Sequence, residues 1–506
     1  MTITRLLVIP AVVIGITPLI GAQPSQAPPE ERIRKADALF AEGDYEDARD
    51  AYRALASNED RDIGRRAAAG AVLSVLRTGD FHGAYRESEN FRRAKPEEAL
   101  IAAVHGDALW AVGRFEDAER EYDAALQLDP EQPRGRHGRA RSLAAMGKLD
   151  DALVAAQESL RLAPREAEFH HTLASVYERQ YHYAEAADAL GQYIPLLPPR
   201  DRGVKAGWVR AEIRFLESFR RRPPLEIQPA RGETAVAPDE VWRVPIRINR
   251  EKVLVKVRVN GAGHEFVLDT GAEQTVISRD VARLRGVSPI AFVQSAGVGD
   301  VGTRGLQIGR IDTLEVGSLK IKNVPCLIRT PAIRGFPSRE PDALSPIALG
   351  LSMRLDYAKR ELIMSRNLPA VDYDDELPMR LHRLAIVRGT LNGSLPASFV
   401  VDTGGEVISI SDATAGLIKP ENPYRRIPLK VYGASGWDRE AFLMPNVDLE
   451  FSNIRFNRIP VVVLNLRAPS ALLGFQVGGI VGHKFLSKYR VTIDLRRSIL
   501  GLETIR

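Results

Sequence analysis

The stretch FVLDTGAEQTVIS, residues 266–278, decides the fold of the second half of the chain. Its apolar start predicts a buried strand, and Asp269 stands where that strand ends. An unpaired carboxylate in a buried position is costly, so Asp269 requires a partner. The same pattern returns at 399–411 as FVVDTGGEVISIS, in which Asp402 occupies the equivalent position.

The repetition extends beyond these two stretches. The segment LEVGSLKIKNVP at 314–325 aligns with LEFSNIRFNRIP at 449–460 at an offset of 135, close to the 133 that separates the two aspartates. Apolar residues alternate with polar ones in both copies, and an Asn-Gly turn precedes each Asp-Thr-Gly strand. This pattern is typical of β-strands joined by tight turns. We therefore predict two copies of one all-β fold at 241–368 and 380–506.

The two Asp-Thr-Gly motifs suggest a shared chemical site. A tight turn at Gly271 or Gly404 allows two backbones to approach, and the threonine hydroxyls can form hydrogen bonds across the junction. If the copies meet about a pseudo-two-fold axis, Asp269 and Asp402 lie together. Two such carboxyls hold one proton between them. The protonated one can donate to a substrate carbonyl while the ionised one activates water, which are the two roles that peptide hydrolysis needs.

With these motifs, the second half resembles the aspartic proteases, in the retropepsin-like branch whose lobes are short. The resemblance implies that Asp269 and Asp402 are the catalytic residues. The residues implied to support this dyad are Thr270, Gly271, Ala272, Thr403, Gly404 and Gly405. The flap candidates are Gly297 and Gly299 in AGVGDVG and Gly433 and Gly436 in YGASG. Most retropepsins dimerise to join two such halves, whereas this chain carries both.

The sequence also departs from the family pattern. We take the apolar-apolar-Gly signatures to be IALG at 347–350 and GIVG at 479–482. Only six residues separate the first signature from Asp356, and twelve separate the second from Asp494. A short helix expected after the signature is therefore predicted to be cropped in the first lobe. His483 stands where family members often have an acid, and we interpret it as structural.

The first half repeats with a period of 34 residues. Helix-breaking prolines recur at Pro96, Pro130, Pro164 and Pro198. Turn positions recur at Gly79, Gly113, Gly147 and Tyr181, with Gly43 two residues out of phase. A small residue follows each turn by five positions, at Ala48, Ala84, Ala118, Ala152 and Ala186. This period resembles the tetratricopeptide repeat. We predict an all-α solenoid at 31–222 that ends in a capping helix.

The resemblance implies that the solenoid binds a peptide or a protein partner. The alternative is that it only spaces or stabilises the following domain.

Residues 223–240 are rich in proline and predict a semi-rigid linker. Residues 1–22 have the layout of a signal peptide, which predicts an exported, periplasmic or secreted protein. An uncleaved anchor is the alternative, and no membrane span is predicted in the mature chain.

Composition and charge bound the number of domains and argue against disulfide, nucleic-acid and metal sites. The chain has 506 residues, of which 44% are hydrophobic, so two or more domains are expected. Cys326 is the single cysteine, so no intramolecular disulfide can form. The net charge of +5 is interspersed along the chain, and Arg220 to Arg222 fit a solvated helix end better than a nucleic-acid site. His170 and His171 are adjacent and cannot share a metal on one helix.

No zinc-protease, serine-hydrolase or nucleotide-binding motif occurs, and we predict neither a metal nor a cofactor. The leading hypothesis is an aspartic endopeptidase that takes a peptide substrate in a bilobal cleft, with repeats that recruit protein. The alternative is an inactive peptide-binding scaffold with a protease fold. The two intact Asp-Thr-Gly motifs favour the enzyme, whereas a cropped first lobe would favour the scaffold.

Overall fold

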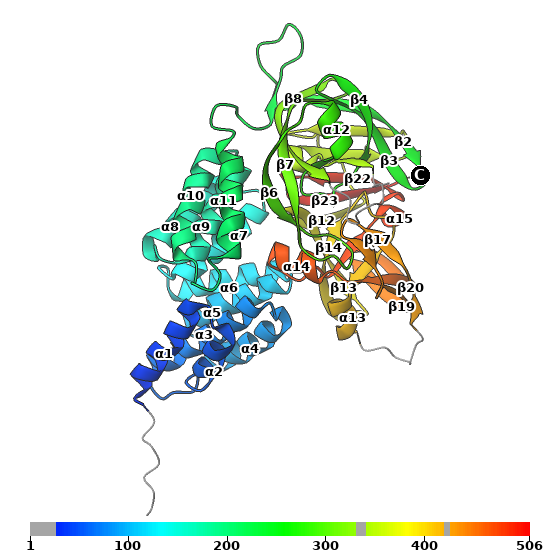
Figure 1. The fold of residues 1–506 in the computed structure, drawn as a ribbon. Coiled ribbons are helices and arrows are strands. Elements are labelled where there is room, and N and C mark those ends of the chain that lie inside the picture. The colour runs from blue at the N-terminus through cyan, green and yellow to red at the C-terminus, as the bar shows by residue number, and fades with distance from the viewer. Residues whose placement is uncertain (1–26, 330–340, 419–425, 506) are drawn as a thin grey trace, which may run out of the picture.

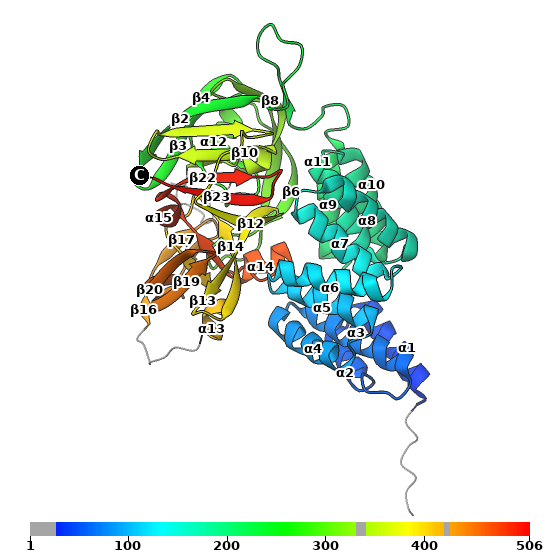
Figure 2. The same ribbon diagram turned by 180° about the vertical axis from the view of Figure 1, so that it is seen from behind.

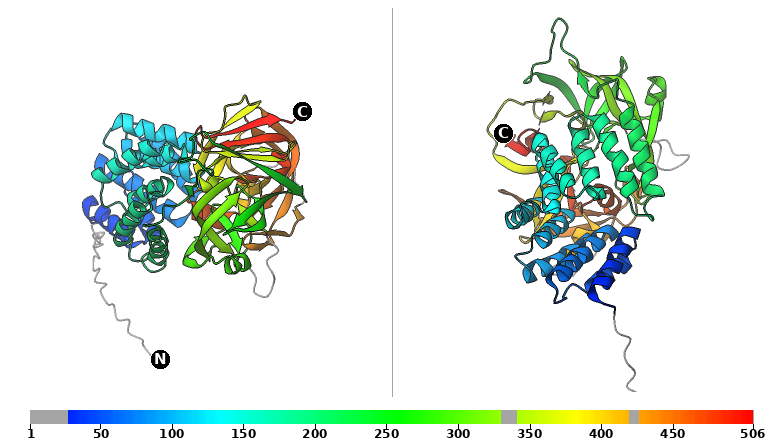
Figure 3. Two further views of the ribbon diagram at one scale, coloured as in Figure 1. Left: turned by 90° about the horizontal axis from the view of Figure 1, so that it is seen from above. Right: turned by 90° about the vertical axis from the view of Figure 1, so that its left-hand side faces the viewer.

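The computed structural model describes residues 27–329, 341–418 and 426–505, and the predicted signal peptide at 1–22 lies outside them. No helix within these ranges is long and apolar enough to cross a membrane. A helical solenoid is followed by a β domain of two lobes, and the two parts lie side by side (Figures 1 and 3). The predicted fold class is therefore confirmed.

Residues 29–217 form five pairs of helices and one further helix. The pairs are α1 (Pro29–Glu42) with α2 (Tyr45–Arg53), α3 (Arg61–Thr78) with α4 (Phe81–Ala94), α5 (Ala99–Ala111) with α6 (Phe115–Leu128), α7 (Pro133–Ala145) with α8 (Leu149–Leu162), and α9 (Ala167–Arg179) with α10 (Tyr183–Leu196), and α11 (Val204–Glu217) follows. The turns within the pairs contain a residue with φ between 63° and 93°, namely Gly43, Gly79, Gly113, Gly147 and Tyr181. The alanines predicted at close helix crossings are 0% exposed, namely Ala48, Ala84, Ala118, Ala152 and Ala186. The 34-residue period is thus confirmed.

The two ends of the solenoid contact each other. The amide of Arg200, in the loop after α10, donates to the carbonyl of Glu42 at the end of α1 at 3.4 Å. The Arg200 guanidinium also pairs with Asp44, and the Tyr45 hydroxyl donates to the Asp201 carboxylate at 3.1 Å. Because the first turn of the array is tied to the loop after the last pair, the repeats form a closed unit rather than an open arc.

Each lobe of the β domain contains its own set of strands and short helices. The elements of lobe 1 are β2 (Val241–Asn249), β3 (Lys252–Val259), β4 (Ala262–Leu268), β5 (Thr275–Ser278), α12 (Arg279–Leu284), β6 (Pro289–Ser295), β7 (Arg304–Val316), β8 (Leu319–Arg329), β9 (Asp342–Leu344), the 3-10 turn η1 (Ile347–Leu349), β10 (Ser352–Asp356) and β11 (Glu361–Ser365). The elements of lobe 2 are β12 (Asp375–His382), β13 (Leu384–Leu391), β14 (Leu395–Val401), β15 (Ser409–Ser411), α13 (Asp412–Leu417), β16 (Ile427–Pro428), β17 (Val431–Gly433), β18 (Gly436–Asp438), β19 (Phe442–Phe451), β20 (Ile454–Leu464), α14 (Arg467–Leu473), β21 (Gly479–Val481), α15 (His483–Leu486), β22 (Tyr489–Asp494) and β23 (Ile499–Thr504).

The two lobes follow the same strand plan. In lobe 1, β4 runs parallel to β9 and β5 runs parallel to β8. In lobe 2, β14 and β21 repeat the first pairing, and β15 and β20 repeat the second. A shared sheet in the order β2, β11, β10, β22, β23, β12 joins the lobes (Figure 2). Arg354 lies opposite Thr492 at the centre of this sheet. One apolar core runs through both lobes, so they form a single β domain.

The predicted cropping of lobe 1 is wrong, because the signature was placed in the wrong register. The carbonyl of Leu344 accepts from the Asp269 amide at 2.9 Å, as the carbonyl of Val481 accepts from the Asp402 amide at 3.1 Å. Since β9 pairs with β4 as β21 pairs with β14, the counterpart of the second-lobe signature ends at residue 345. The sequence IALG at 347–350 comes after it.

With this register, the two lobes have nearly the same length. Eleven residues separate Ser345 from Asp356, and twelve separate Gly482 from Asp494. The 3-10 turn η1 in lobe 1 stands where α15 stands in lobe 2. A serine at the position of the expected glycine hid this match in the sequence. Lobe 1 therefore keeps a turn at this position.

The start of the predicted linker packs on lobe 1. Leu225 and Ile227 are buried in the core of the β domain. The short strand β1 (Glu226–Ile227) pairs antiparallel with β8. This contact fixes the point at which the chain leaves the solenoid and enters the β domain.

The turn edge of the solenoid lies against the β domain. Methyl groups added at the turn glycines Gly113 and Gly147 would meet Ser398 and the Leu495 carbonyl, at 2.5 and 2.8 Å. Arg380 of lobe 2 forms hydrogen bonds of 2.6 and 2.8 Å with the carboxylate of Glu119 in α6. Apolar residues of α5, α6 and lobe 2 also share a buried cluster. The repeats are therefore packed onto lobe 2 and do not swing freely.

Candidate active site

The two Asp-Thr-Gly turns interlock through their threonines. The hydroxyl of Thr270 donates to the Val401 carbonyl at 2.6 Å and accepts from the Thr403 amide at 3.0 Å. The hydroxyl of Thr403 donates to the Leu268 carbonyl at 2.8 Å and accepts from the Thr270 amide at 3.1 Å. Both threonines are buried, at 1% and 0% exposure. These four reciprocal bonds fix one lobe's turn against the other.

Glycine allows the two aspartates to approach across this junction. A side chain at Gly271 would begin 2.5 Å from Cγ of Asp402, and one at Gly404 would begin 2.6 Å from Cγ of Asp269. Real side chains never approach so closely, so both positions require glycine. Each carboxyl therefore lies over the glycine of the opposite lobe, which places the two carboxyls next to each other at the lobe junction.

The surroundings of the two carboxyls differ. Asp402 Oδ1 accepts from the amides of Gly404 and Gly405 at 2.8 and 2.9 Å, whereas Asp269 Oδ1 accepts from Gly271 alone at 3.0 Å. Amide donors stabilise a negative charge. Burial, together with the charge and hydrogen bond of Asp402, raises the pKa of Asp269 to about 8. The amide donors at Asp402 and the raised pKa of Asp269 together favour Asp269 as the member that carries the shared proton.

Two cross-lobe contacts support the turns, and neither was predicted from the sequence. The Lys252 ammonium, at the start of β3, donates to the Gly404 carbonyl and lies 3.5 Å from Glu406. From lobe 2 to lobe 1, Arg383, which precedes β13, forms an ion pair with Glu273. Glu273 and Glu406 both follow their aspartate by four residues, so extending the internal alignment could have identified them.

The residues after Asp402 receive additional support from α15. The amides of His483 and Lys484 donate to the carbonyls of Gly405 and Glu406 at 2.7 and 3.0 Å. The ring of His483 packs edge-on against Tyr357 at 5.3 Å between centroids, and burial lowers its pKa. His483 thus acts on the turn through its backbone. In lobe 1, residue 346 is a proline and has no amide hydrogen to donate to the turn that contains Ala272.

The two flap candidates meet at their tips. We define the lobe-1 flap as β6, β7 and residues 296–303 between them, and the lobe-2 flap as residues 431–438. The Gly297 amide donates to the Ser435 hydroxyl at 3.0 Å, and the Ser435 amide donates to the Val298 carbonyl at 2.9 Å. The tips therefore close on each other by direct hydrogen bonds.

Glycines make this contact possible. A side chain at Gly299 would begin 2.4 Å from the Ser435 backbone, and one at Gly433 would begin 2.5 Å from the Val298 carbonyl. Gly299 and Gly436 also have φ values of 133° and 90°, which side chains disfavour. The predicted flap glycines thus lie at the points where the two tips touch.

Two surface cavities lie away from the dyad. One of about 470 Å³ borders α13 and Phe442, and one of about 460 Å³ borders Arg220 and Arg310. Neither is lined by Asp269 or Asp402. Among the described residues, no group of three or more His, Cys, Asp or Glu side chains could hold a metal ion.

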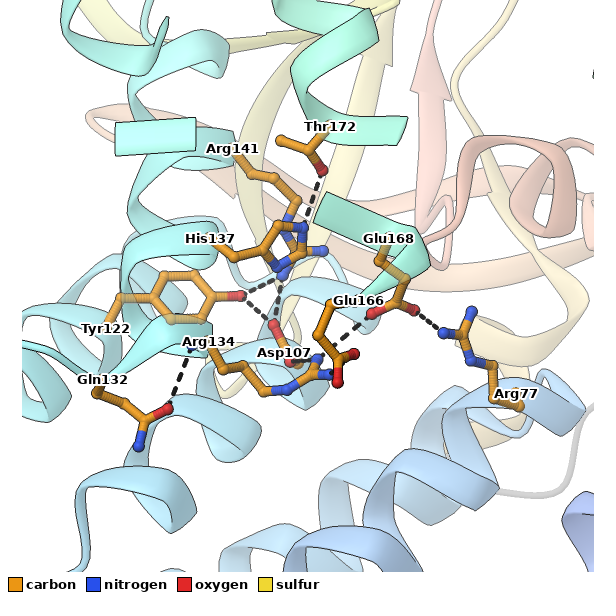
Figure 4. Close-up of polar contacts among 10 residues, drawn as sticks. All are labelled: Arg77, Asp107, Tyr122, Gln132, Arg134, His137, Arg141, Glu166, Glu168 and Thr172. Atoms are coloured by element: carbon orange, nitrogen blue, oxygen red, sulfur yellow. Dashed lines mark hydrogen bonds and ion pairs between the residues drawn. The ribbon is translucent and has the colours of Figure 1, made fainter. Parts of the chain in front are cut away.

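The repeats carry an ion-pair network of their own (Figure 4). The Asp107 carboxylate accepts hydrogen bonds from Tyr122 at 2.9 Å, Arg134 at 2.8 Å and Arg141 at 2.5 Å. Its further members are Arg77, Gln132, His137, Glu166, Glu168 and Thr172. Arg77 of α3 reaches Glu168 of α9 at 2.5 Å, across three repeats. Because the charges of this network are largely paired within the solenoid, a partner bound there would have to displace these pairs.

Comparison with known families agrees with this architecture. Residues 255–353 and 387–485 each match the family model described as aspartyl protease. Residues 70–133, 103–152 and 137–200 match the model described as tetratricopeptide repeat. The resemblances stated from the sequence are therefore confirmed. Comparison with curated proteins finds no match.

Solved structures of tetratricopeptide repeat proteins are similar to part of the chain. A thermophilic tetratricopeptide repeat protein of Thermus thermophilus is 19% identical, covers 38% of this chain and 100% of its own, and has a TM-score of 0.31. YrrB, described as a tetratricopeptide repeat protein with an unusual peptide-binding site, is 21% identical and covers 35% of this chain and 89% of its own, with a TM-score of 0.22.

Proposed function

We propose that this protein is an aspartic-type endopeptidase. The premise is that two tandem aspartyl protease lobes follow tetratricopeptide repeats in one chain. The observation that carries the proposal is the reciprocal bonding of Thr270 and Thr403, which places the carboxyls of Asp269 and Asp402 together at the lobe junction. A partly exposed carboxyl pair that shares one proton is suited to acid-base catalysis.

In this mechanism the aspartates have different roles. Asp402, which accepts two amide hydrogen bonds, is the ionised base that takes a proton from water. The water oxygen attacks the peptide carbonyl carbon while Asp269 gives its proton to the carbonyl oxygen. When the tetrahedral gem-diol collapses, Asp402 gives its proton to the departing amine nitrogen as the carbon–nitrogen bond breaks. One hydroxyl of the gem-diol gives its proton to Asp269 and becomes the carbonyl of the new carboxyl group, so the pair again holds one proton on Asp269.

We also assign the flaps control of access to this pair, because the hydrogen bonds between their tips must break before the tips can part. We further propose that the solenoid recruits the protein substrate or a partner, as extended repeat surfaces commonly do.

The apolar segment at 1–22 supports export to a periplasmic or secreted location, with anchoring by an uncleaved segment as the other outcome.

The test is whether the full chain cleaves an unfolded protein and a mixed peptide library between about pH 3 and about pH 9, a range that brackets ordinary and raised aspartate pKa values. New termini detected by mass spectrometry are the expected result. A folded chain that leaves every peptide intact at each pH would instead indicate the peptide-binding scaffold. The observation that favoured that scaffold, a cropped first lobe, no longer stands, because η1 occupies the position in question.

Lys252 provides a prediction about pH. Its positive charge lowers the pKa of Asp269, against the larger effect of burial. Lys252→Gln should therefore raise that pKa further and move the alkaline limb of the kcat/KM profile to higher pH, because the shared proton is retained longer. Arg383→Gln removes the matching contact to Glu273 and serves as the control. If the alkaline limb of the kcat/KM profile moved to higher pH by the same amount in both variants, the shift would not be a specific charge effect of Lys252.

A further inference from the structure

The lobe-1 flap rests on the last helix of the solenoid. The Trp208 ring, on α11, lies against Gly305 at the base of the flap tip, where an added methyl would be 2.9 Å from the ring. The Phe292 ring of β6 borders the same position at 3.9 Å. Trp208 thus covers the point at which β7 emerges from the flap tip.

Further contacts extend along the same surface. Ala291 and Ile308 of the flap are buried in one apolar cluster with Val209 and Phe215 of α11. Close by, the Arg310 guanidinium lies 5.4 Å from the Phe219 ring centroid and donates to the Ser218 carbonyl at 3.0 Å. The flap base is therefore packed on the solenoid along much of its length, as Figure 1 shows for β6 and α11.

The same solenoid is packed onto lobe 2 at another place. Phe115 of α6 meets Phe475 edge-on at 5.1 Å between centroids. The Ser498 hydroxyl donates to the Met146 carbonyl at 2.6 Å, and the Gln476 amide donates to the Ala111 carbonyl at 2.7 Å. Because the repeats are also closed end to end, they form a rigid connection from lobe 2 to the flap of lobe 1.

The lobe-2 flap differs from its partner. Its strands β17 and β18 contain three residues each and pair only with each other among the described strands. Tyr432 and Trp437 on this hairpin are 43% and 41% exposed. Within the part of the chain that the structure describes, no hydrogen bond or ion pair connects residues 431–438 to α11. Ser435 and Asp438 of this hairpin are buried, and its backbone bonds outside the hairpin go to the lobe-1 flap tip rather than to the solenoid. A short hairpin that is held at its tip opens more readily than a long one that is packed on a helix along its base.

We propose that Trp208 is a positioning residue for substrate binding: it holds the lobe-1 flap in place from the solenoid, so that substrate enters by movement of the lobe-2 flap. This inference rests on the proposed peptidase function. It assigns the repeats a role in the catalytic domain that does not depend on partner binding. Trp208 does not touch the dyad and acts through the flap.

Hydrogen exchange of the full chain tests this inference without requiring activity. In the wild type, amides of residues 431–438 should exchange faster than those of β6 and β7. Trp208→Ala should make the lobe-1 flap amides exchange roughly tenfold faster, because local opening becomes easier, and Trp208→Phe should restore most of the protection. Val204→Ala, at a position on the same helix that is 76% exposed, is the matched control and should change nothing.

Kinetics provide the second measurement. For Trp208→Ala, KM should rise by roughly tenfold with little change in kcat, since a loosened flap must be ordered when substrate binds. Unchanged flap exchange in folded Trp208→Ala would overturn the inference, as would loss of kcat with an unchanged KM. If the wild type cleaves nothing, the proposed function fails, and the exchange experiment still decides whether Trp208 holds the flap.

Discussion

Asp269→Asn and Asp402→Asn are each expected to reduce peptide cleavage by at least about a thousandfold. Either substitution removes one member of the pair, so the site loses either the base that activates water or the acid that protonates the carbonyl oxygen. Because the two carboxyls lie together and act as one unit, the double variant should be little worse than either single one. The measurement is kcat/KM on a peptide that the wild type cleaves.

Asp312→Asn provides the matched control for this result. Its side chain is 67% exposed and forms an ion pair with Arg222 at 3.8 Å, and neither residue is part of the candidate site. Activity equal to that of the wild type is expected. If one dyad variant kept substantial activity while the other lost it, the two lobes would not share a single site.

Thr270→Val is expected to destabilise the β domain by about 2–5 kcal/mol. The substitution leaves the buried Thr403 amide and Val401 carbonyl without their partner, and each such loss costs roughly 1–3 kcal/mol. The thermal midpoint of the β domain should fall by roughly 5–15 °C. Valine has nearly the same shape as threonine, so the loss reports the hydroxyl rather than the volume.

Thr270→Ser is the matched comparison, because it keeps the hydroxyl and removes one methyl group. It should cost only about 1 kcal/mol and retain most of the thermal midpoint. Equal destabilisation by valine and serine would mean that packing, and not the reciprocal hydrogen bonds, joins the two turns.

The sequence was most informative where a pattern is local or repeated. The 34-residue period predicted the solenoid because each helix pair has its own turn residue and small crossing residue, such as Gly113 and Ala118. The duplication predicted two similar lobes, since alternation and turn residues recur at a nearly constant offset. The structure brings Asp269 and Asp402 together at the interface of these lobes.

Features that depend on non-local pairing were not predicted. The signature of lobe 1 was misplaced because its register is set by parallel pairing of β9 with β4, about 75 residues apart, and Ser345 stands where a glycine was expected. The contact between Trp208 and Gly305 joins a helix to a hairpin of a different domain. No local pattern encodes such a contact.

The central claim, that Asp269 and Asp402 share one proton, can be measured directly. The carboxyl carbon shifts of the two aspartates, labelled with carbon-13 and assigned by difference from the two Asn variants, can be followed from about pH 3 to about pH 9. We predict coupled titration of the pair, with the shared proton lost near the raised pKa of about 8 at Asp269. Independent titration of both carboxyls near the ordinary aspartate value of about 3.9 would contradict the shared dyad.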